Sequence, residues 1–127
     1  MEEKFQKVVQ EVFGKVEECL PQEWEKCCFY AAFTVGTYTM KFYIKNKKGE
    51  YIDCYNLGID DNQLAFLFMD IDDIVRPYRD ALESKQKWNV LTLIVESNGK
   101  FNVDFDYADV SENSIEYQRN WEKKYLN

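Results

Sequence analysis

The sequence predicts an α+β protein built on one mainly antiparallel sheet of about five strands. Two amphipathic helical patterns, a final helical segment and five alternating or apolar strand segments follow one another in the order α-β-β-β-α-β-β-α. Strands joined by short turns favour antiparallel pairing, and no strand–helix–strand series is present. A chain of 127 residues suits one domain, so we expect a single domain over residues 1–127 with the helices on one face of the sheet.

The first third of the chain predicts a helix and three strands. Apolar residues recur at helical spacing from Phe5 to Leu20, and Pro21 ends the pattern. The segment "WEKCCFYAAF" is apolar at both alternations, as in a central strand covered on both faces. In "YTMKFYI" the alternation is cleaner, so one face of that strand should meet water. A turn at "KNKKGE" then leads into a short third strand in "YIDCYNL".

The middle of the chain predicts a long second helix. Asp60 and Gln63 have the spacing of a capping box. Pro77 should kink the helix or split it near Arg76, because proline lacks the N–H that the helix needs. Phe66 and Met69 lie off the apolar stripe; they could belong to a partner surface, but we expect them in the core. The stripe itself comprises Leu64, Leu67, Phe68, Ile71, Ile74, Val75, Tyr78 and Leu82.

The last third predicts a hairpin and a helix. "NVLTLIVE" is a strand, "SNGK" predicts a two-residue type I′ turn, and the segment from Phe101 to Tyr107 is the partner strand. Trp88 and Phe105 are expected in the core. From about Asn113, "NSIEYQRNWEKKYL" predicts a final helix with lysines in its last turn.

The charge of the chain narrows its possible partners. Sixteen basic and 23 acidic side chains give a net charge of −7, which disfavours nucleic acid and anionic membranes as partners. The acids are clustered: seven lie between Gly49 and Val75 and five between Phe101 and Gln118, and neither stretch contains Lys or Arg. Such an acidic surface suits a basic partner, and a merely solubilising surface is the alternative.

Carboxylates also line one side of the last predicted strand. Its apolar residues alternate with Asn102, Asp104 and Asp106, so we expect the two aspartates to face outward while Phe105 faces the core. By alternation Tyr107 belongs with the core-facing Phe101 and Phe105, but near the strand's end its hydroxyl could reach an interface. Solvation of an open sheet face is the alternative role for the strand aspartates. The candidate partner-binding residues are Asp104, Asp106, Tyr107 and Asp109, with Asp70, Asp72 and Asp73 on the second helix.

Catalysis is not expected. The chain has no histidine, so Ser-His and Cys-His nucleophile arrangements are unavailable, and neither GxxxxGK[ST] nor GxGxxG occurs. Asp104 and Asp106 should point in parallel with alpha carbons about 6.6 Å apart, rather than converge on a metal ion. "DIDDI" lacks the glycine and the distant Glu of an EF-hand loop. We therefore predict no enzyme, no cofactor and no metal.

The cysteines and the absence of membrane segments predict a cytoplasmic protein. Cys19, Cys27, Cys28 and Cys54 lack CxxC spacing and lie among apolar residues, so we expect buried thiols. No apolar run approaches the roughly 20 residues of a membrane span. The start, "MEEKFQKVVQEVF", is charged and amphipathic, unlike a signal peptide.

Several segments together resemble the YezG-like antitoxin family, which includes EsaG-type immunity proteins. They are the amphipathic first helix with "LPQEW", the "FY" of the first strand, "WNVLTLIVESNGKFNVDFDYAD" and the terminal "RNWEKKYL". The "NGKFNVDFDY" block is the most specific of them. The resemblance covers nearly the whole chain.

The resemblance implies a bacterial immunity protein that binds and silences a cognate toxin. Such toxins are of the LXG type, commonly nucleases exported by a type VII secretion system. The carboxylates would then occupy the basic surface with which a nuclease holds phosphates. An adaptor that escorts the toxin to its export machinery without blocking its activity is the alternative. The sequence leaves the toxin's identity and the oligomeric state open.

Overall fold

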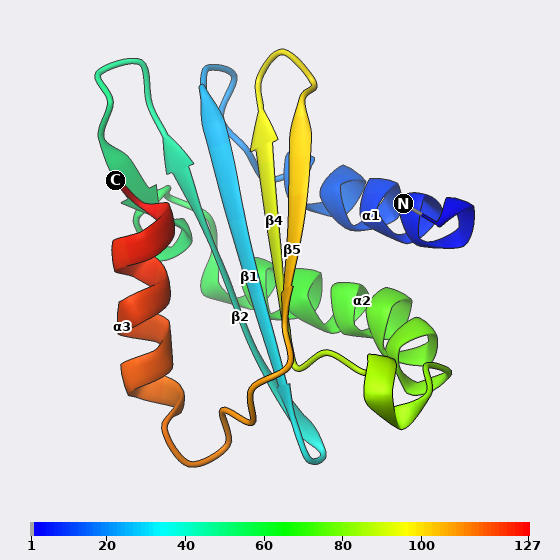
Figure 1. Ribbon diagram of the computed structural model, residues 1–127. Coiled ribbons are helices and arrows are strands. Elements are labelled where there is room, and N and C mark those ends of the chain that lie inside the picture. The colour runs from blue at the N-terminus through cyan, green and yellow to red at the C-terminus, as the bar shows by residue number, and fades with distance from the viewer. Residues whose placement is uncertain (1) are drawn as a thin grey trace. The chain divides into compact units, whose positions relative to one another are not determined.

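The computed structural model describes residues 2–127 and confirms the α+β class and the predicted order of elements (Figure 1). The chain forms two compact units. A helical unit comprises the chain up to Gln22 together with Tyr55–Lys87, and a sheet unit comprises Glu23–Cys54 and Trp88–Asn127. None of the helices within residues 2–127 is long and apolar enough to cross a membrane. The extent of the predicted single domain, residues 1–127, stays a prediction.

The helical unit consists mainly of α1 (Glu3–Glu17) and α2 (Asp61–Asp80). Two contacts show that the helices are antiparallel: the rings of Phe5 and Tyr78 lie 5.2 Å apart, and Gln63 Nε2 donates to Cys19 Sγ at 3.7 Å. A short 3-10 helix, η1 (Cys54–Asn56), precedes α2, and a second, η2 (Ser84–Gln86), follows it. The buried residues of the two helices are Phe5, Val9, Val12, Val16, Leu64, Leu67, Phe68, Ile71 and Val75.

Two expectations for α2 are wrong. Asp60 is the N-cap residue but its side chain makes no capping hydrogen bond, and the Gln63 side chain donates to Cys19 Sγ rather than closing a capping box. Of the two effects expected of Pro77, the split is absent, because the helix continues to Asp80, and the kink stays a prediction. Phe66 and Met69 are not core residues, since 65% and 53% of their surfaces are exposed. They lie on the face opposite the buried stripe.

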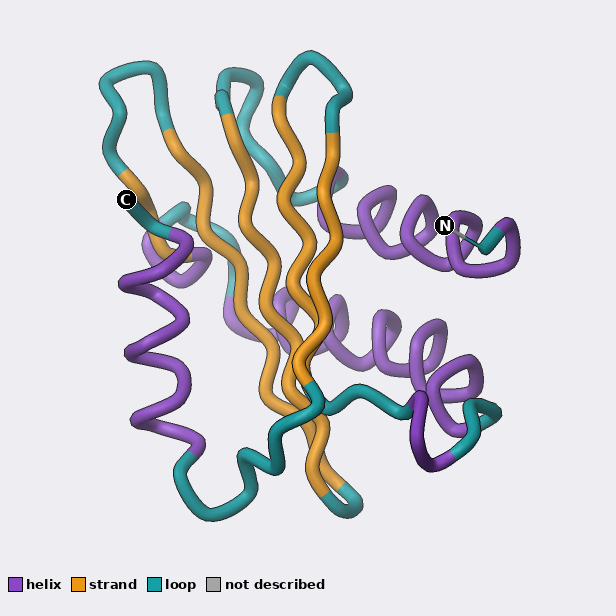
Figure 2. Tube along the Cα trace, in the orientation of Figure 1, coloured by secondary structure: helices purple, strands orange, loops and turns teal. Residues whose placement is uncertain are grey.

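The sheet has the order β3-β2-β1-β4-β5, and every neighbouring pair is antiparallel. Figure 2 shows the strands side by side, with the hairpin turns at their ends. β1 (Lys26–Thr34) is central and buried along almost its whole length, as its two-sided apolar pattern predicts. β2 (Thr37–Lys45) and the short β3 (Tyr51–Asp53) continue on one side, and β4 (Val90–Glu96) and β5 (Phe101–Asp106) on the other.

The β4–β5 turn differs from the predicted type I′ turn. That turn needs positive φ at both central residues, but within residues 2–127 only glycines have positive φ, among them Gly99 at +92°. The Gly99 N–H donates to the Glu96 carbonyl at 2.9 Å, and Asn98 Oδ1 accepts from the Lys100 N–H at 3.0 Å. This is a type I turn followed by a left-handed glycine. The Asn98 side chain stabilises it, so Asn98 itself avoids the left-handed region.

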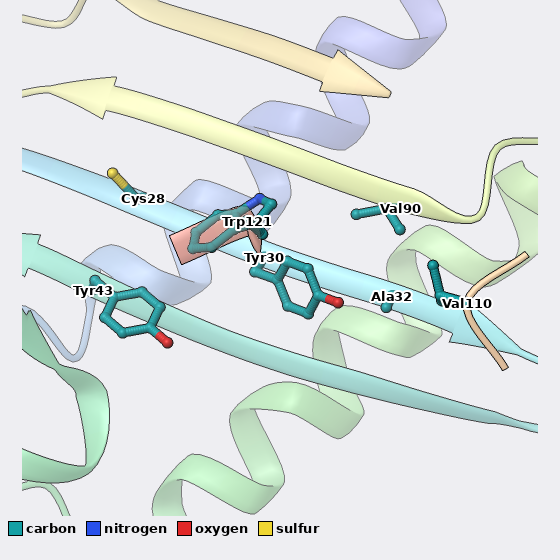
Figure 3. Close-up of a cluster of buried hydrophobic side chains, with 7 residues drawn as sticks. All are labelled: Cys28, Tyr30, Ala32, Tyr43, Val90, Val110 and Trp121. Carbon is teal, nitrogen blue, oxygen red and sulfur yellow. The ribbon is translucent and has the colours of Figure 1, made fainter. Parts of the chain in front are cut away.

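The final helix, α3 (Ser114–Tyr125), is confirmed, with Lys123 and Lys124 in its last turn. Figure 3 shows Trp121 of α3 above β1, close to Tyr30 and Tyr43. The face that α3 covers carries a core cluster of Cys28, Tyr30, Ala32, Tyr43, Val90, Val110 and Trp121. That α1 and α2 share this face of the sheet stays a prediction.

Candidate partner-binding surfaces

Trp121 anchors α3 to the sheet. Its side chain is buried, and its ring meets Tyr30 edge-on at 5.0 Å and Tyr43 at 5.8 Å. The indole Nε1–H donates to Thr92 Oγ1 at 2.8 Å, which gives the buried Thr92 hydroxyl a partner. The hydroxyl of Tyr43, on β2, also donates a hydrogen bond to Glu122 Oε2 at 3.2 Å. Ring packing and hydrogen bonds therefore fix the position of the helix over β1, β2 and β4.

The register of β5 places its aspartates on the face that α3 covers. Asp104 pairs with Thr92 and Asp106 pairs with Val90, and residues directly opposite share a face. Both aspartates are half-buried. The expectation that they face open water is therefore wrong. The reason lies in the tertiary structure: α3 packs on this face, and its tyrosine hydroxyls donate hydrogen bonds to the carboxylates.

Two tyrosines of α3 bind these carboxylates. Tyr125 donates to Asp104 Oδ2 at 2.8 Å, and Tyr117 donates to Asp106 Oδ2 at 2.5 Å. Asp106 Oδ1 also accepts the Ala108 N–H at 2.9 Å, so both of its oxygens are engaged. The Tyr117 hydrogen bond is the main reason that the pKa of Asp106 is lowered. Burial, followed by the neighbouring aspartate, raises the pKa of Tyr117 and raises that of Tyr125 to about 12.

A pocket of about 330 Å³ opens between β5 and α3. The two carboxylates and the hydroxyls that bind them lie in its wall, and Lys124, with Nζ 5.2 Å from the Tyr125 ring centre, is the cation there. Its volume is at the lower end of the range for small-molecule sites, and its wall is polar. It can admit one long side chain. The lining residues are Thr92, Asp104, Phe105, Asp106, Tyr117, Asn120, Trp121, Lys124 and Tyr125.

The opposite side of β5 is apolar and partly exposed. Trp88 is buried, as expected, with 2% of its surface accessible. Phe105 stacks on Trp88 at 5.1 Å, yet 38% of its surface is exposed, and Phe101 is 46% exposed. The prediction that Phe105 is a core residue is therefore wrong. β5 ends the sheet, so its side chains have a strand neighbour on one flank only.

The segment after β5 presents the remaining predicted site residues to solvent. Tyr107 is 56% exposed rather than in the core, and its carbonyl oxygen accepts a hydrogen bond from Asn89 Nδ2 at 3.1 Å. Asp109 is exposed, and its Oδ1 accepts the N–H and the hydroxyl of Ser111 at 3.0 and 2.7 Å. These bonds lower the pKa of Asp109. The structure thus places Asp104 and Asp106 together, with Tyr107 and Asp109 following them along the chain.

The three α2 aspartates lie in the helical unit. Asp70 and Asp73 are exposed, whereas Asp72 is half-buried and binds Arg76 Nε at 2.9 Å. Phe66 lies three to four residues before Met69 and Asp70, and Asp73 follows at the next turn, so these four exposed residues share one helix face. We call this face, comprising Phe66, Met69, Asp70 and Asp73, the α2 face. It joins exposed apolar side chains to exposed carboxylates that form no ion pair within residues 2–127.

Among the residues of the β5–α3 pocket that sequence reasoning missed are Tyr117, Tyr125 and Lys124. A signal was present, because Tyr117, Trp121 and Tyr125 recur every four residues and so share one face of a helix. The hydroxyls of Tyr117 and Tyr125 bind carboxylates that lie two residues apart on β5, those of Asp106 and Asp104. Only the path of α3 across the sheet shows that these two series meet.

The chain is similar to a family of known proteins and to a protein with a known name. The family described as immunity protein YezG-like matches residues 5–127, which include nearly all of α1 and everything that follows it. The immunity protein YezG of Bacillus spizizenii (strain ATCC 23059 / NRRL B-14472 / W23) is 24% identical over 108 residues, which cover 80% of this chain and 67% of that protein. Residues 5–127, which the family matches, contain both the β5–α3 pocket and the α2 face.

Proposed function

This chain belongs to the YezG-like family of immunity proteins, and on that premise we propose that it neutralises a cognate nuclease toxin by binding it through an acidic surface. A nuclease must be basic where it holds phosphates, so carboxylates presented by an inhibitor can occupy that region. Opposite charges also speed association through electrostatic steering. Binding takes place in the cytoplasm of the producing cell, before the toxin is exported by a type VII secretion system.

The α2 face is the observation that supports this proposal best. Phe66 and Met69 are 65% and 53% exposed, and aromatic and Met side chains are enriched at protein interfaces. Asp70 and Asp73 flank them, and no Lys or Arg occurs between Gly49 and Val75. Apolar anchors surrounded by like charges suit a partner with an apolar pocket and a basic rim.

The pocket between β5 and α3 is a second candidate surface. Asp104 and Asp106 already accept hydrogen bonds from tyrosines, and within residues 2–127 Asp104 has a partner at Oδ2 only. An Arg or Lys side chain of the toxin could enter the pocket and reach the other Asp104 oxygen. Tyr107 and Asp109 are exposed beyond the strand and would extend the contact.

Paired substitutions of equal charge distinguish the two surfaces. We expect Asp70→Asn with Asp73→Asn to raise the Kd for the toxin about 30-fold or more, because each lost carboxylate leaves a toxin cation unpaired. Asp104→Asn with Asp106→Asn tests the pocket, and Glu17→Gln with Glu18→Gln, both exposed on or beside α1, removes the same charge elsewhere. Isothermal calorimetry measures each Kd. If both test pairs bind as the control pair does, the acidic-surface proposal is wrong.

Nuclease activity in the purified complex tests neutralisation itself. An inhibitor abolishes the activity at one-to-one stoichiometry, and the host survives when both proteins are expressed. A complex that retains full activity would instead support the escorting adaptor. The toxin is obtained by co-expression with this protein.

A further inference from the structure

α3 is less buried than the other two helices. Within residues 2–127, Trp121 is its only buried residue, whereas α1 has four and α2 has five. The segment that joins β5 to α3, residues 107–113, is exposed apart from Val110. Elements with few buried apolar contacts open at a lower free-energy cost than the whole fold. Detaching α3 should therefore cost less than unfolding the sheet.

Hydrogen bonds form much of the attachment of α3 to the sheet. Tyr117 donates to Asp106 Oδ2 at 2.5 Å, and Tyr125 donates to Asp104 Oδ2 at 2.8 Å. Water can replace these partners when the groups separate, so the net contribution of each bond to stability is modest. The buried Trp121 supplies apolar contact, with the half-buried rings of the two tyrosines packed against the same cluster. Many of the groups that hold the helix are therefore ones that water can also satisfy.

The face of the sheet beneath α3, which we call the α3 face, is more polar than the opposite face. Several of its side chains end in hydroxyl or carboxylate groups, whereas the alternate side chains of the same strands are aliphatic or phenyl groups. Because exposing apolar surface to water is a main cost of opening a fold, the α3 face costs less to uncover than the opposite face. The α3 face includes Cys28, Tyr30, Ala32, Tyr43, Val90, Thr92, Asp104 and Asp106, and the opposite face includes Phe29, Ala31, Phe33, Phe42, Ile44, Leu91, Leu93 and Val95.

Buried thiols lie on both faces of the sheet. Cys28 belongs to the cluster that contains Trp121, beneath α3 (Figure 3). Cys27 precedes it on β1 and so points to the opposite face. Burial, and after it the thiols of Cys28 and Cys54, raises the pKa of Cys27, so the buried Cys54 lies near Cys27. Cys28 can therefore report on α3, and Cys54 on the rest of the sheet.

We propose that α3 detaches from the sheet as a unit while the five strands stay folded. Detachment uncovers the α3 face and frees Asp104 and Asp106 from their tyrosine donors, so the β5–α3 pocket exists only while α3 is attached. In the open state Cys28 is accessible, whereas Cys54 stays buried. The proposal concerns this chain alone, so it holds or fails whether or not the toxin binds.

Thiol modification of the full chain tests the proposal. The initial rates of reaction with N-ethylmaleimide are measured for each cysteine by peptide mass spectrometry and divided by the rate of the same cysteine in unfolding urea. Without urea, we expect Cys28 to react about tenfold or more faster than Cys54. Low urea should accelerate Cys54 but hardly change Cys28, because detaching α3 exposes less surface than unfolding the sheet. Equal rates and equal urea dependence would overturn the proposal.

Two conservative variants distinguish detachment of α3 from unfolding of the sheet. Tyr117→Phe removes a hydrogen bond that both processes break, so it should raise the rates of Cys28 and Cys54 by the same factor, about 5- to 30-fold. Ile44→Val alters a buried residue on the opposite face and should raise the Cys54 rate about 2- to 12-fold while leaving the Cys28 rate unchanged. If Ile44→Val accelerates Cys28 as much as Cys54, Cys28 is reached only by unfolding of the sheet and the proposal is wrong. A Cys28 rate that does not respond to Tyr117→Phe would also overturn it, because another motion would then expose the thiol.

Discussion

The hydrogen bond between Tyr117 and Asp106 should stabilise the fold, and a double-mutant cycle can measure by how much. The Tyr117 hydroxyl donates to Asp106 Oδ2 at 2.5 Å, and a hydrogen bond to a charged group contributes about 1.5 to 3 kcal/mol. Both side chains are half-buried, so part of this is lost to solvent screening, and we expect a coupling free energy of about 1 to 2 kcal/mol. The variants are Asp106→Asn, Tyr117→Phe and the double variant, compared by urea unfolding with circular dichroism detection.

The pH dependence of this coupling has a definite sign. The Tyr117 hydrogen bond lowers the folded pKa of Asp106 below its ordinary value of 3.8. The stabilisation is therefore fully present above that value and is lost as the pH falls through the lowered folded pKa. The difference in unfolding free energy between the unmodified protein and Asp106→Asn should shrink correspondingly in acid.

A second double-mutant cycle, with another aspartate, controls for a general effect of removing negative charge. Asp73 is exposed on α2, and Asp73→Asn removes the same charge as Asp106→Asn. Combined with Tyr117→Phe, it should show no coupling. A coupling below about 0.3 kcal/mol in the Asp106 cycle, which is within the usual additivity of independent sites, would refute the role given to this hydrogen bond.

Three other predictions follow from burial. Trp121→Ala should lower the unfolding free energy by about 3 to 5 kcal/mol in denaturant melts, because the indole is buried and hydrogen-bonded, and a loss under about 1 kcal/mol would contradict its anchoring role. The folded pKa of Tyr125 is about 12, against an unperturbed value of 10.0, so the stabilisation that its hydroxyl gives is present below pH 10 and lost as the pH rises toward 12. In denaturant melts over this pH range, the unfolding free energies of the unmodified protein and of Tyr125→Phe should therefore converge. A thiol reagent should modify the partly exposed Cys19 before the buried Cys28 and Cys54. In urea, where the protein is unfolded, all three should react at similar rates, and similar rates in the folded protein would contradict their burial.

Local patterns predicted the elements of this fold well. The two-sided apolar pattern of residues 24–33 correctly indicated the central strand, because burial on both faces leaves no polar alternation. The short third strand and the final helix were also predicted. These features depend on side chains close together in the sequence, and their periodicity is therefore visible without the fold.

The facing of β5 could not be predicted in the same way. Alternation showed two kinds of side chain on its two faces, and polarity suggested that Asp104 and Asp106 face water. The outcome depends on α3, whose tyrosines give these carboxylates hydrogen-bond partners, while Phe101 and Phe105 lie on the other side of the strand and are partly exposed. Phe66 and Met69 show a related limit, since hydrophobicity alone does not distinguish an interior residue from an exposed one.

The pairing of β1 with β4 has a consequence for the kinetics of folding. β1–β2 and β4–β5 are hairpins with short turns, and their contacts can form locally. β1 meets β4 only after the chain between them, including the whole of α2, has been closed into a loop. Loop closure costs entropy that grows with the logarithm of loop length, and non-local pairing slows folding. We expect the β1–β4 contact to form after the β1–β2 hairpin, so substitutions in the β1–β2 turn should mainly change the folding rate, and a shorter connection between β3 and β4 should accelerate folding.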